Sequence, residues 1–251
     1  MEIYGLKIGE REIEKSLMFF MEGFNETIVI SYYFWCIKTD NKVILIDTGF
    51  LPEVSVERNV RNYKSPDLLL KEIGVEPDEV DIVLLTHLHW DHFGGYSYFP
   101  NAKFYVQRTE WEFATGEFSN TKVIKQFYDK HLLQKVEQLI ENKQLEIIDN
   151  TFNPLSGIQL VSFGGHTPGS QVIMVDTDRH PVIFCGDLGY FYRNFEEENP
   201  PMLNLDIPEC LAAYRRIKEI VKEKKGTVIP GHDPVILDKF NKISERVIRI
   251  K

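Results

Sequence analysis

Three histidines and one aspartate fall within six consecutive positions of the chain, a density of metal-binding side chains that packing or solvation of a loop does not require. Residues 86–95 read THLHWDHFGG, and we call this segment the metal loop. Imidazole nitrogens and carboxylate oxygens suit zinc, iron or manganese, with geometry and availability deciding among them. The metal loop therefore predicts a metal site, with four candidate ligands: His87, His89, Asp91 and His92.

The candidate ligands follow a short apolar run that predicts a buried strand. Residues 80–85 read VDIVLL, rich in β-branched and aliphatic side chains. The ligands therefore lie where a strand ends, and we expect Gly94 and Gly95 to let the chain turn tightly behind them.

Three further strand ends carry the same kind of side chain. His166 lies in the turn GGHTPG at 164–169, Asp187 follows the apolar run 182–185, and His232 follows the run 227–230. One such histidine alone is more often a hydrogen-bonded turn residue, but the repetition favours ligands that converge on one edge of a sandwich. Two other histidines, His131 and His180, have no partner motif and are interpreted as structural or surface residues.

Taken together, the pattern His-x-His-x-Asp-His, a distal His, Asp and His, and the turn Asp47-Thr48-Gly49 resemble the metallo-β-lactamase superfamily. The resemblance covers nearly the whole chain. It implies an α+β fold, an αβ/βα sandwich of two β-sheets face to face with helices on the outer faces. It also implies that Asp47 orders the ligand loop, although spacing alone fits an ordinary turn-forming aspartate equally well.

By the same resemblance, the site holds two divalent metal ions, with zinc the first choice and iron, manganese or cobalt as alternatives. Two cations that share a water can lower its pKa from about 15.7 to about 7, which supplies a bridging hydroxide for hydrolysis at neutral pH. The superfamily pattern assigns His87, His89 and His166 to one metal, Asp91, His92 and His232 to the other, and Asp187 to both.

Tyr190, three residues after Asp187, reduces the number of substrate classes to be considered. Together with residues 194–200, residues 106–111 and the pair Trp35-Cys36, it resembles the N-acyl homoserine lactone lactonases, which are quorum-quenching enzymes. The resemblance implies that Tyr190 orients the lactone or stabilises its oxyanion and that Asp91 carries a proton to the leaving oxygen. The competing interpretation is that Tyr190 only packs at the edge of the core.

Other branches of the superfamily remain as alternatives. The same site could cleave another lactone or ester, a thioester as in glyoxalase II, or a phosphodiester, and a third class is a metal-binding regulatory protein without turnover. Two branches are disfavoured by single positions. Flavin-linked di-iron members have an acidic residue where this chain has His89, and zinc β-lactamases have Cys where this chain has Asp187. Glyoxalase-II-like enzymes append a helical domain, whereas few residues follow His232. RNA-processing members need a positively charged surface, whereas this chain has a net charge of −9, which disfavours that branch.

Composition predicts an ordinary soluble globular protein. It has 251 residues, 43% hydrophobic and 27% charged, with a net charge of −9 that argues against a nucleic-acid surface. We find neither a signal peptide nor an apolar run of the roughly 20 residues that a membrane span needs. Three scattered cysteines, Cys36, Cys185 and Cys210, favour a reducing, cytoplasmic compartment over a disulfide framework.

Apolar periodicity predicts one domain over residues 1–251, with β-rich and helical blocks in both halves. We expect strands at 27–38, 42–47, 80–85, 102–106, 145–148, 158–163, 171–176, 182–185 and 227–230. We expect helices at 65–74, capped by Ser65, within 108–142, and from Asp206 to Gly226. Residues 17–21 (LMFFM), with Trp90 and Phe93, could line an acyl-chain groove, although such a run is more often core or a contact in a homodimer.

Overall fold

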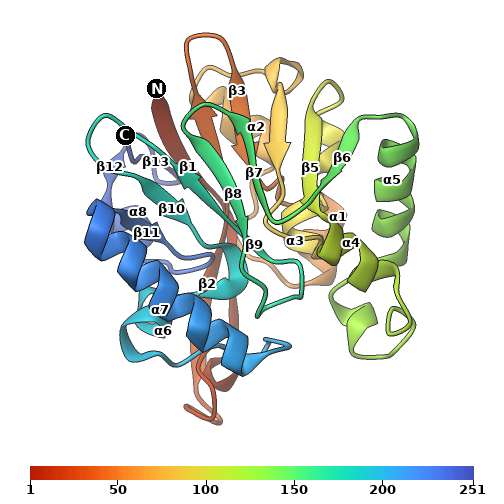
Figure 1. Ribbon diagram of the computed structural model, residues 1–251, viewed down its shortest axis with the longest axis vertical. Helices are drawn as coiled ribbons and strands as arrows, with labels where there is room; N and C mark the ends of the chain where they lie inside the picture. Colours follow the sequence, from red (N-terminus) through yellow and green to blue (C-terminus); the bar gives the residue numbers. More distant parts are fainter. The chain divides into compact units, whose positions relative to one another are not determined.

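The computed structural model describes residues 1–251, which form two β-sheets with helices beside them (Figure 1). The chain divides into two compact units. The first unit contains Met1–Arg11, Ser31–Ile148 and Val235–Lys251, and the second contains Glu12–Ile30 and Asp149–Pro234. No helix is both long enough and apolar enough to cross a membrane.

The sheet of the first unit has eight strands, and the four strands from β3 to one edge are parallel. From one edge to the other they are β12 (Asn241–Lys242), β13 (Val247–Arg249), β1 (Glu2–Glu14), β2 (Thr27–Lys38), β3 (Val43–Ile46), β4 (Ile82–Leu84), β5 (Lys103–Gln107) and β6 (Leu145–Ile148). The expected strands at 27–38 and 42–47 are confirmed, and they pair as the antiparallel strands β2 and β3 with Trp35 opposite Ile46. β3, β4, β5 and β6 then run parallel, so their carboxyl ends meet at one edge of the sheet.

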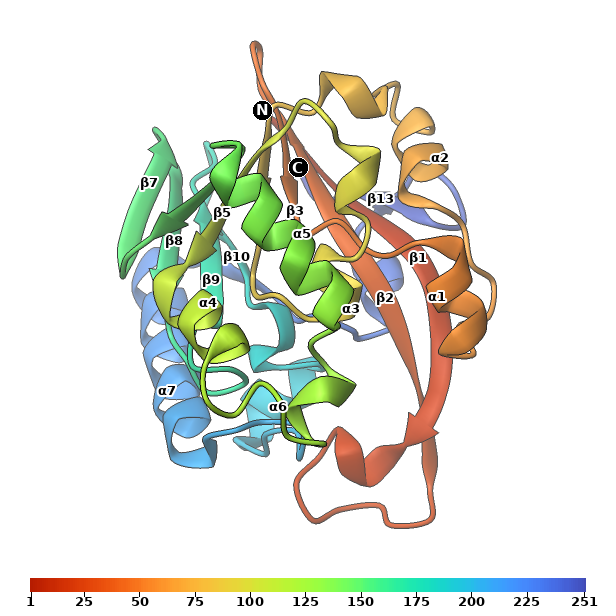
Figure 2. The same cartoon turned by 90° about the vertical axis from the view of Figure 1, so that its right-hand side faces the viewer.

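Helices of the first unit lie along this sheet. α1 (Pro52–Glu57) lies beside β1 (Figure 2), where the backbones of Glu10 and Arg61 form a bridge. α4 (Arg108–Thr115) contacts β5 and β6, and α5 (Lys130–Glu141) contacts β6. The remaining elements are α2 (Pro66–Lys71), α3 (Trp90–Phe93) and α8 (Ile236–Lys239), with 3₁₀ turns η2 (Pro77–Glu79), η3 (Tyr96–Tyr98) and η4 (Ile124–Gln126).

The second unit has a five-stranded sheet covered by a long helix. The strand order is β11 (Thr227–Ile229), β10 (Val182–Phe184), β9 (Gln171–Val175), β8 (Ile158–Ser162) and β7 (Thr151–Leu155). α7 (Ile207–Lys224) packs on this sheet through a buried cluster that includes Tyr214, Cys210 and Met174 (Figure 1). Two 3₁₀ turns, η1 (Lys15–Leu17) and η5 (Gly186–Leu188), and the helix α6 (Tyr192–Glu197) complete the unit.

Several element boundaries differ from the sequence prediction. The helical stretch expected at 108–142 is broken into α4, η4 and α5, so Ile124 and Tyr128 lie outside the long helix. β1, β7, β12 and β13 were not predicted, because Gly5 and Gly9 interrupt β1, Pro154 interrupts β7, and β12 and β13 are only two and three residues long. Ser65 precedes α2 as expected, but its side chain makes no capping hydrogen bond. The Asp206 carboxylate caps α7 by accepting from Glu209 N at 2.8 Å.

Candidate metal centre

In the first unit, the parallel pairing of β3 and β4 places Asp47 beside the metal loop. Ile46 is paired with Leu84, so the residues that follow both strands emerge at the same edge of the sheet. Asp47 N donates to Leu84 O at 3.0 Å, and the Asp47 carboxylate accepts from Thr86 N at 2.7 Å. The expected ordering of the ligand loop by Asp47 therefore has a direct structural basis.

Asp47 also orients an imidazole of the metal loop. Its Oδ2 lies 2.7 Å from Nδ1 of His92, and both side chains are buried. Since a carboxylate can only accept, Nδ1 carries the proton and Nε2 carries the lone pair that a metal would take. Metal-binding histidines usually engage a carboxylate or carbonyl through the other ring nitrogen in this way.

Thr86 extends the same orientation to His87. Its hydroxyl donates to Asp47 Oδ2 at 2.8 Å, which leaves its oxygen to accept from Nδ1 of His87 at 3.0 Å. Nε2 of His87 is thereby the nitrogen with the lone pair. One carboxylate and one hydroxyl thus fix the tautomers of two candidate ligands.

His89 is held by a different set of neighbours, which the sequence did not identify. Its ring stacks on Phe127 with centroids 5.1 Å apart and meets Tyr128 edge-on at 4.7 Å. Tyr128 Oη donates to Oε1 of the fully buried Glu110 at 2.8 Å, and Leu88 N donates to the same oxygen at 2.9 Å. Glu110 thereby connects the metal loop to the segment that packs on His89. Its only signal in the sequence is its place in residues 106–111, which resemble the lactonases.

The tight turn behind the ligands depends on space rather than on unusual dihedral angles. Gly94 and Gly95 both have negative φ, unlike the expectation of a turn that needs glycine for its backbone freedom. A Cβ on Gly95 would lie 2.3 Å from Thr48 O, and one on Gly94 would lie 2.2 Å from Trp90 O. The close approach of Gly95 to Thr48 and the hydrogen bond from Thr48 N to His92 O at 2.7 Å place α3, which carries Asp91 and His92, against the turn at 47–49.

In the second unit, three strand ends bring His166, Asp187 and His232 together. β10 and β11 are parallel, and β8 runs in the same direction two strands away, so all three chains leave the sheet at one edge. Asp187 presents its two oxygens to two imidazoles: Oδ1 lies 2.9 Å from Nε2 of His232, and Oδ2 lies 3.6 Å from Nε2 of His166. A carboxylate divided in this way between two nitrogen ligands suits a bridging role.

Tyr190 lies against two of these imidazoles. Its ring stacks on that of His232 with centroids 4.7 Å apart, and it meets the ring of His166 edge-on at 6.0 Å. His232 N donates to Tyr190 O at 2.9 Å, which fixes the two residues side by side. The tyrosine that the sequence singled out is therefore part of the ligand cluster of the second unit.

The donor set of each unit fits divalent metal ions. In the first unit the ligand atoms of His87 and His89, and those of Asp91 and His92, lie within 4.8 Å of each other. The same limit holds in the second unit for Asp187 with each histidine. Buried carboxylates are costly unless they are paired or bind a cation, and imidazole with carboxylate is a donor set for zinc, iron or manganese. All seven candidate ligands are buried: His87, His89, Asp91, His92, His166, Asp187 and His232.

The other residues named in the sequence analysis, from the apolar run 17–21 to the two remaining histidines, are divided between core and surface. Met18 and Phe19 are buried, whereas Phe20 and Met21 are 42% and 62% exposed, so only part of the apolar run could line a groove. Phe93 is fully buried and stacks on Tyr96. His131 and His180 are exposed, as expected.

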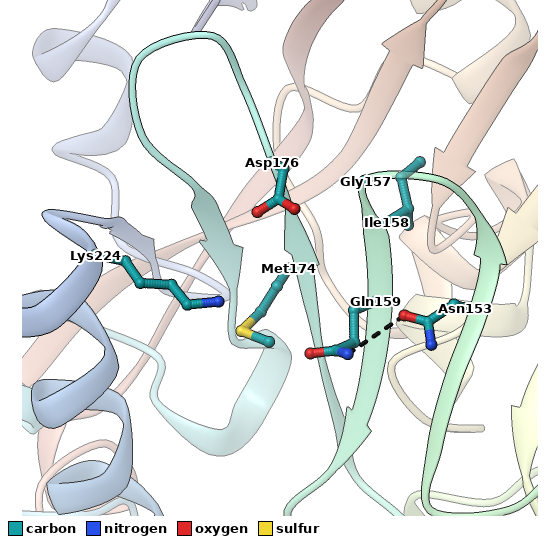
Figure 3. A pocket seen from close by; sticks show the side chains of 7 residues that line it. All are labelled: Asn153, Gly157, Ile158, Gln159, Met174, Asp176 and Lys224. Atoms are coloured by element: carbon teal, nitrogen blue, oxygen red, sulfur yellow. Dashed lines mark hydrogen bonds between the residues drawn. The ribbon is translucent and has the colours of Figure 1, made fainter.

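Two hollows of the second unit lie apart from the candidate ligands. A polar cavity of about 120 Å³ at the β7–β8 turn is lined by Asp176 and Lys224, and there Gln159 Nε2 donates to Asn153 Oδ1 at 3.3 Å (Figure 3). An apolar groove of about 300 Å³ runs along α7 between Phe195 and Val228. Neither hollow contains a predicted metal ligand, so the ligand clusters remain the candidate site.

Comparison with known proteins finds the same superfamily that the sequence motifs resemble, over most of the chain. The Metallo-beta-lactamase superfamily profile matches residues 27–232. The chain is 32% identical over 217 residues to an N-acyl homoserine lactonase of Bacillus sp., covering 79% of this chain and 80% of the relative. It is 28% identical over 179 residues to the N-acyl homoserine lactonase AttM of Rhizobium radiobacter, covering 70% of this chain and 66% of that protein.

Solved structures agree with the predicted fold. A quorum-quenching N-acyl homoserine lactone lactonase matches with a TM-score of 0.81 at 26% identity, covering 98% of both chains. An N-acyl homoserine lactone hydrolase with N-hexanoyl-L-homoserine bound at its catalytic metal centre matches with a TM-score of 0.80 at 25% identity, covering 96% of both chains. The expected α+β fold is confirmed, and this chain belongs to the metallo-β-lactamase superfamily.

Proposed function

We propose that this chain is a metal-dependent hydrolase that opens the ring of N-acyl homoserine lactones, which makes it a quorum-quenching lactonase. The observation that carries the proposal is the packing of Tyr190 on His166 and His232, two buried candidate ligands. The lactonase relatives and the product-bound structure named above support the same substrate class.

In this proposal residues 1–251 act as one hydrolase domain, and the ligands of both units bind two divalent ions. His87, His89 and His166 would hold one ion, and Asp91, His92 and His232 the other, with Asp187 shared between them. Zinc is the proposed metal, since five imidazoles and two carboxylates suit it, while iron, manganese and cobalt take the same donors. Bound there, the two ions would polarise the lactone carbonyl and lower the pKa of a water molecule.

The chain's own residues supply the remaining steps. The Tyr190 hydroxyl donates a hydrogen bond to the oxygen of the lactone carbonyl, where negative charge develops during attack. The Asp91 carboxylate accepts the proton of the attacking water and delivers it to the ring oxygen as the carbon–oxygen bond breaks. The product is the N-acyl homoserine with a free carboxylate and a free hydroxyl group.

The proposed location is the cytoplasm, which is supported by three cysteines that are all buried and free. A homodimer is also proposed, with the exposed Phe20 and Met21 as candidate contacts. Analytical ultracentrifugation of the protein with and without charged substitutions at these two positions tests the dimer.

A hydrolysis panel with metal analysis on the same sample tests the proposed activity. The panel contains short- and long-chain N-acyl homoserine lactones, simple γ- and δ-lactones, a thioester and bis-p-nitrophenyl phosphate. We expect turnover of the homoserine lactones that is lost with a chelator and restored by zinc. Fast phosphodiester or thioester cleavage without lactone turnover would replace this proposal by another hydrolase. A metal-loaded protein inert toward the whole panel would favour the regulatory alternative.

A further inference from the structure

Asn204, in the segment between α6 and α7, contacts one of the candidate metal ligands. Its Oδ1 lies 3.0 Å from Nδ1 of His166. Backbone hydrogen bonds next to the two residues fix this contact. Leu205 N and Asp206 N, which follow Asn204, donate to the oxygen of Gly165, which precedes His166, at 3.1 and 3.0 Å. The Asn204 side chain is therefore held against the turn that carries His166.

This contact determines which nitrogen of His166 can bind a metal. An amide oxygen only accepts, so Nδ1 of His166 carries the proton and Nε2 carries the lone pair. Nε2 is also the nitrogen that faces Asp187, at 3.6 Å from Oδ2. Asn204 thus fixes the tautomer and the ring orientation that a shared site with Asp187 requires.

The other end of the same amide has no protein partner. Nδ2 of Asn204 is buried and makes no hydrogen bond. Turning the amide over would not help, because Nδ2 would then face the Nδ1–H group of His166 and two donors would meet. A buried donor without an acceptor costs about 1–3 kcal/mol, and native proteins rarely keep one without a reason.

We propose that Asn204 has two roles: it positions His166, and its Nδ2 group binds the acyl amide oxygen of the substrate. The second role rests on the proposed function. The Asn204 amide contacts Nδ1 of His166, and the Tyr190 ring meets the same imidazole edge-on, so both hydrogen-bond donors belong to side chains next to this candidate ligand. The lactone carbonyl takes the Tyr190 hydroxyl in the proposed reaction. The acyl amide oxygen, attached next to the same ring, is the acceptor that remains for Nδ2.

Two substitutions separate the roles. Asn204→Asp keeps an acceptor for His166 but has no amide donor, whereas Asn204→Ala removes both. Asn153→Asp makes the same chemical change at an exposed position of the same unit and serves as the control. Urea unfolding of each metal-free variant checks that the fold is intact.

Metal affinity tests the positioning role without any substrate. In chelator competition with zinc, we expect Asn204→Ala to bind about 10- to 100-fold more weakly than the wild type, and Asn204→Asp and Asn153→Asp to match it within a few-fold. Equal affinity of the wild type and Asn204→Ala would overturn the positioning role.

Paired substrates test the binding role. We expect Asn204→Asp to raise KM for N-hexanoyl homoserine lactone about 10-fold, the equivalent of one hydrogen bond, and to leave KM unchanged for a γ-alkyl lactone that lacks the amide. Equal effects on both lactones, or no effect on either, would overturn the substrate contact. If the wild type cleaves neither lactone, the proposed function and the contact fail together, while the metal titration still decides the positioning role.

Discussion

The Asp47 carboxylate accepts a hydrogen bond from Nδ1 of His92 at 2.7 Å, and this pair connects the end of one parallel strand to the ligands that follow the next strand. Asp47 adopts a left-handed backbone conformation with φ of 62°, a conformation that aspartate and asparagine tolerate better than most residues. Position 47 therefore needs a residue that tolerates the left-handed conformation and whose side chain only accepts hydrogen bonds.

Replacing Asp47 with Asn should weaken metal binding while keeping the backbone. Asparagine tolerates the left-handed conformation, but its amide has only one acceptor oxygen for Thr86 and His92, and its NH₂ group would oppose a donor. We expect zinc affinity to fall about 10- to 100-fold in chelator competition. Asp40→Asn, at an exposed turn of the same unit, is the control. Unchanged zinc affinity would show that Asp47 serves only the turn.

How much of the site was predictable depended on the distance along the chain between partners. The candidate ligands are concentrated in short strand-end motifs, so His87, His89, Asp91 and His92 and the distal His166, Asp187 and His232 could be chosen from local patterns. Glu110 and Asn204 could not, because their hydrogen-bond partners, Leu88 and His166, lie 22 and 38 positions away along the chain. A lone glutamate in a helix or an asparagine in a loop has no local signal for such a role.

The secondary structure also contains elements that local sequence patterns could predict and elements that they could not. Strands of buried β-branched residues, such as β4 and β9, were located because both faces are apolar. β1 was missed because Gly5 and Gly9 interrupt its sequence EIYGLKIGEREIE and break the alternation of apolar and polar side chains, although its first half is buried. The helix expected across 108–142 breaks because the segment around Ile124 and Phe127 turns to pack on His89, a tertiary contact that periodicity cannot show.

Replacing Tyr128 with Phe should destabilise the metal loop without removing the ring that packs on His89. The substitution deletes the 2.8 Å hydrogen bond to the fully buried Glu110 carboxylate, and a hydrogen bond to a charged group contributes about 1.5–3 kcal/mol. Urea unfolding of the metal-free protein should show a loss of this size. Tyr96→Phe removes a hydroxyl that makes no hydrogen bond, so its unfolding midpoint should stay near that of the wild type. Equal midpoints for both variants would contradict the prediction.

Replacing Tyr190 with Phe should slow turnover without loss of metal. The phenyl ring still stacks on His232, so we expect the zinc content to be unchanged. Removing one donor to a developing oxyanion costs about 10²- to 10³-fold in kcat in comparable sites, and a loss of this order on homoserine lactones is expected. Steady-state kinetics with metal analysis of the same preparation provide the measurement. An unchanged kcat/KM would remove Tyr190 from the mechanism.

The thiol of Cys36 predicts a specific alkaline limit to stability. Burial raises the pKa of this thiol from 9.0 to about 12, with Lys38 lowering it slightly. Below pH 9 the thiol is protonated in both the folded and the unfolded chain, so the pH has no effect through this group. Above pH 9 only the unfolded chain releases the proton, and stability falls until the folded thiol also ionises near pH 12.

Cys36→Ala lacks this dependence of stability on pH but carries a constant cost for the lost side chain. We therefore expect the unfolding free energies of the two proteins to converge by about 1.4 kcal/mol per pH unit between about pH 9 and pH 11. Urea unfolding in steps of pH measures this convergence, and parallel curves for the two proteins would show that the Cys36 thiol ionises as readily in the folded chain as in the unfolded one.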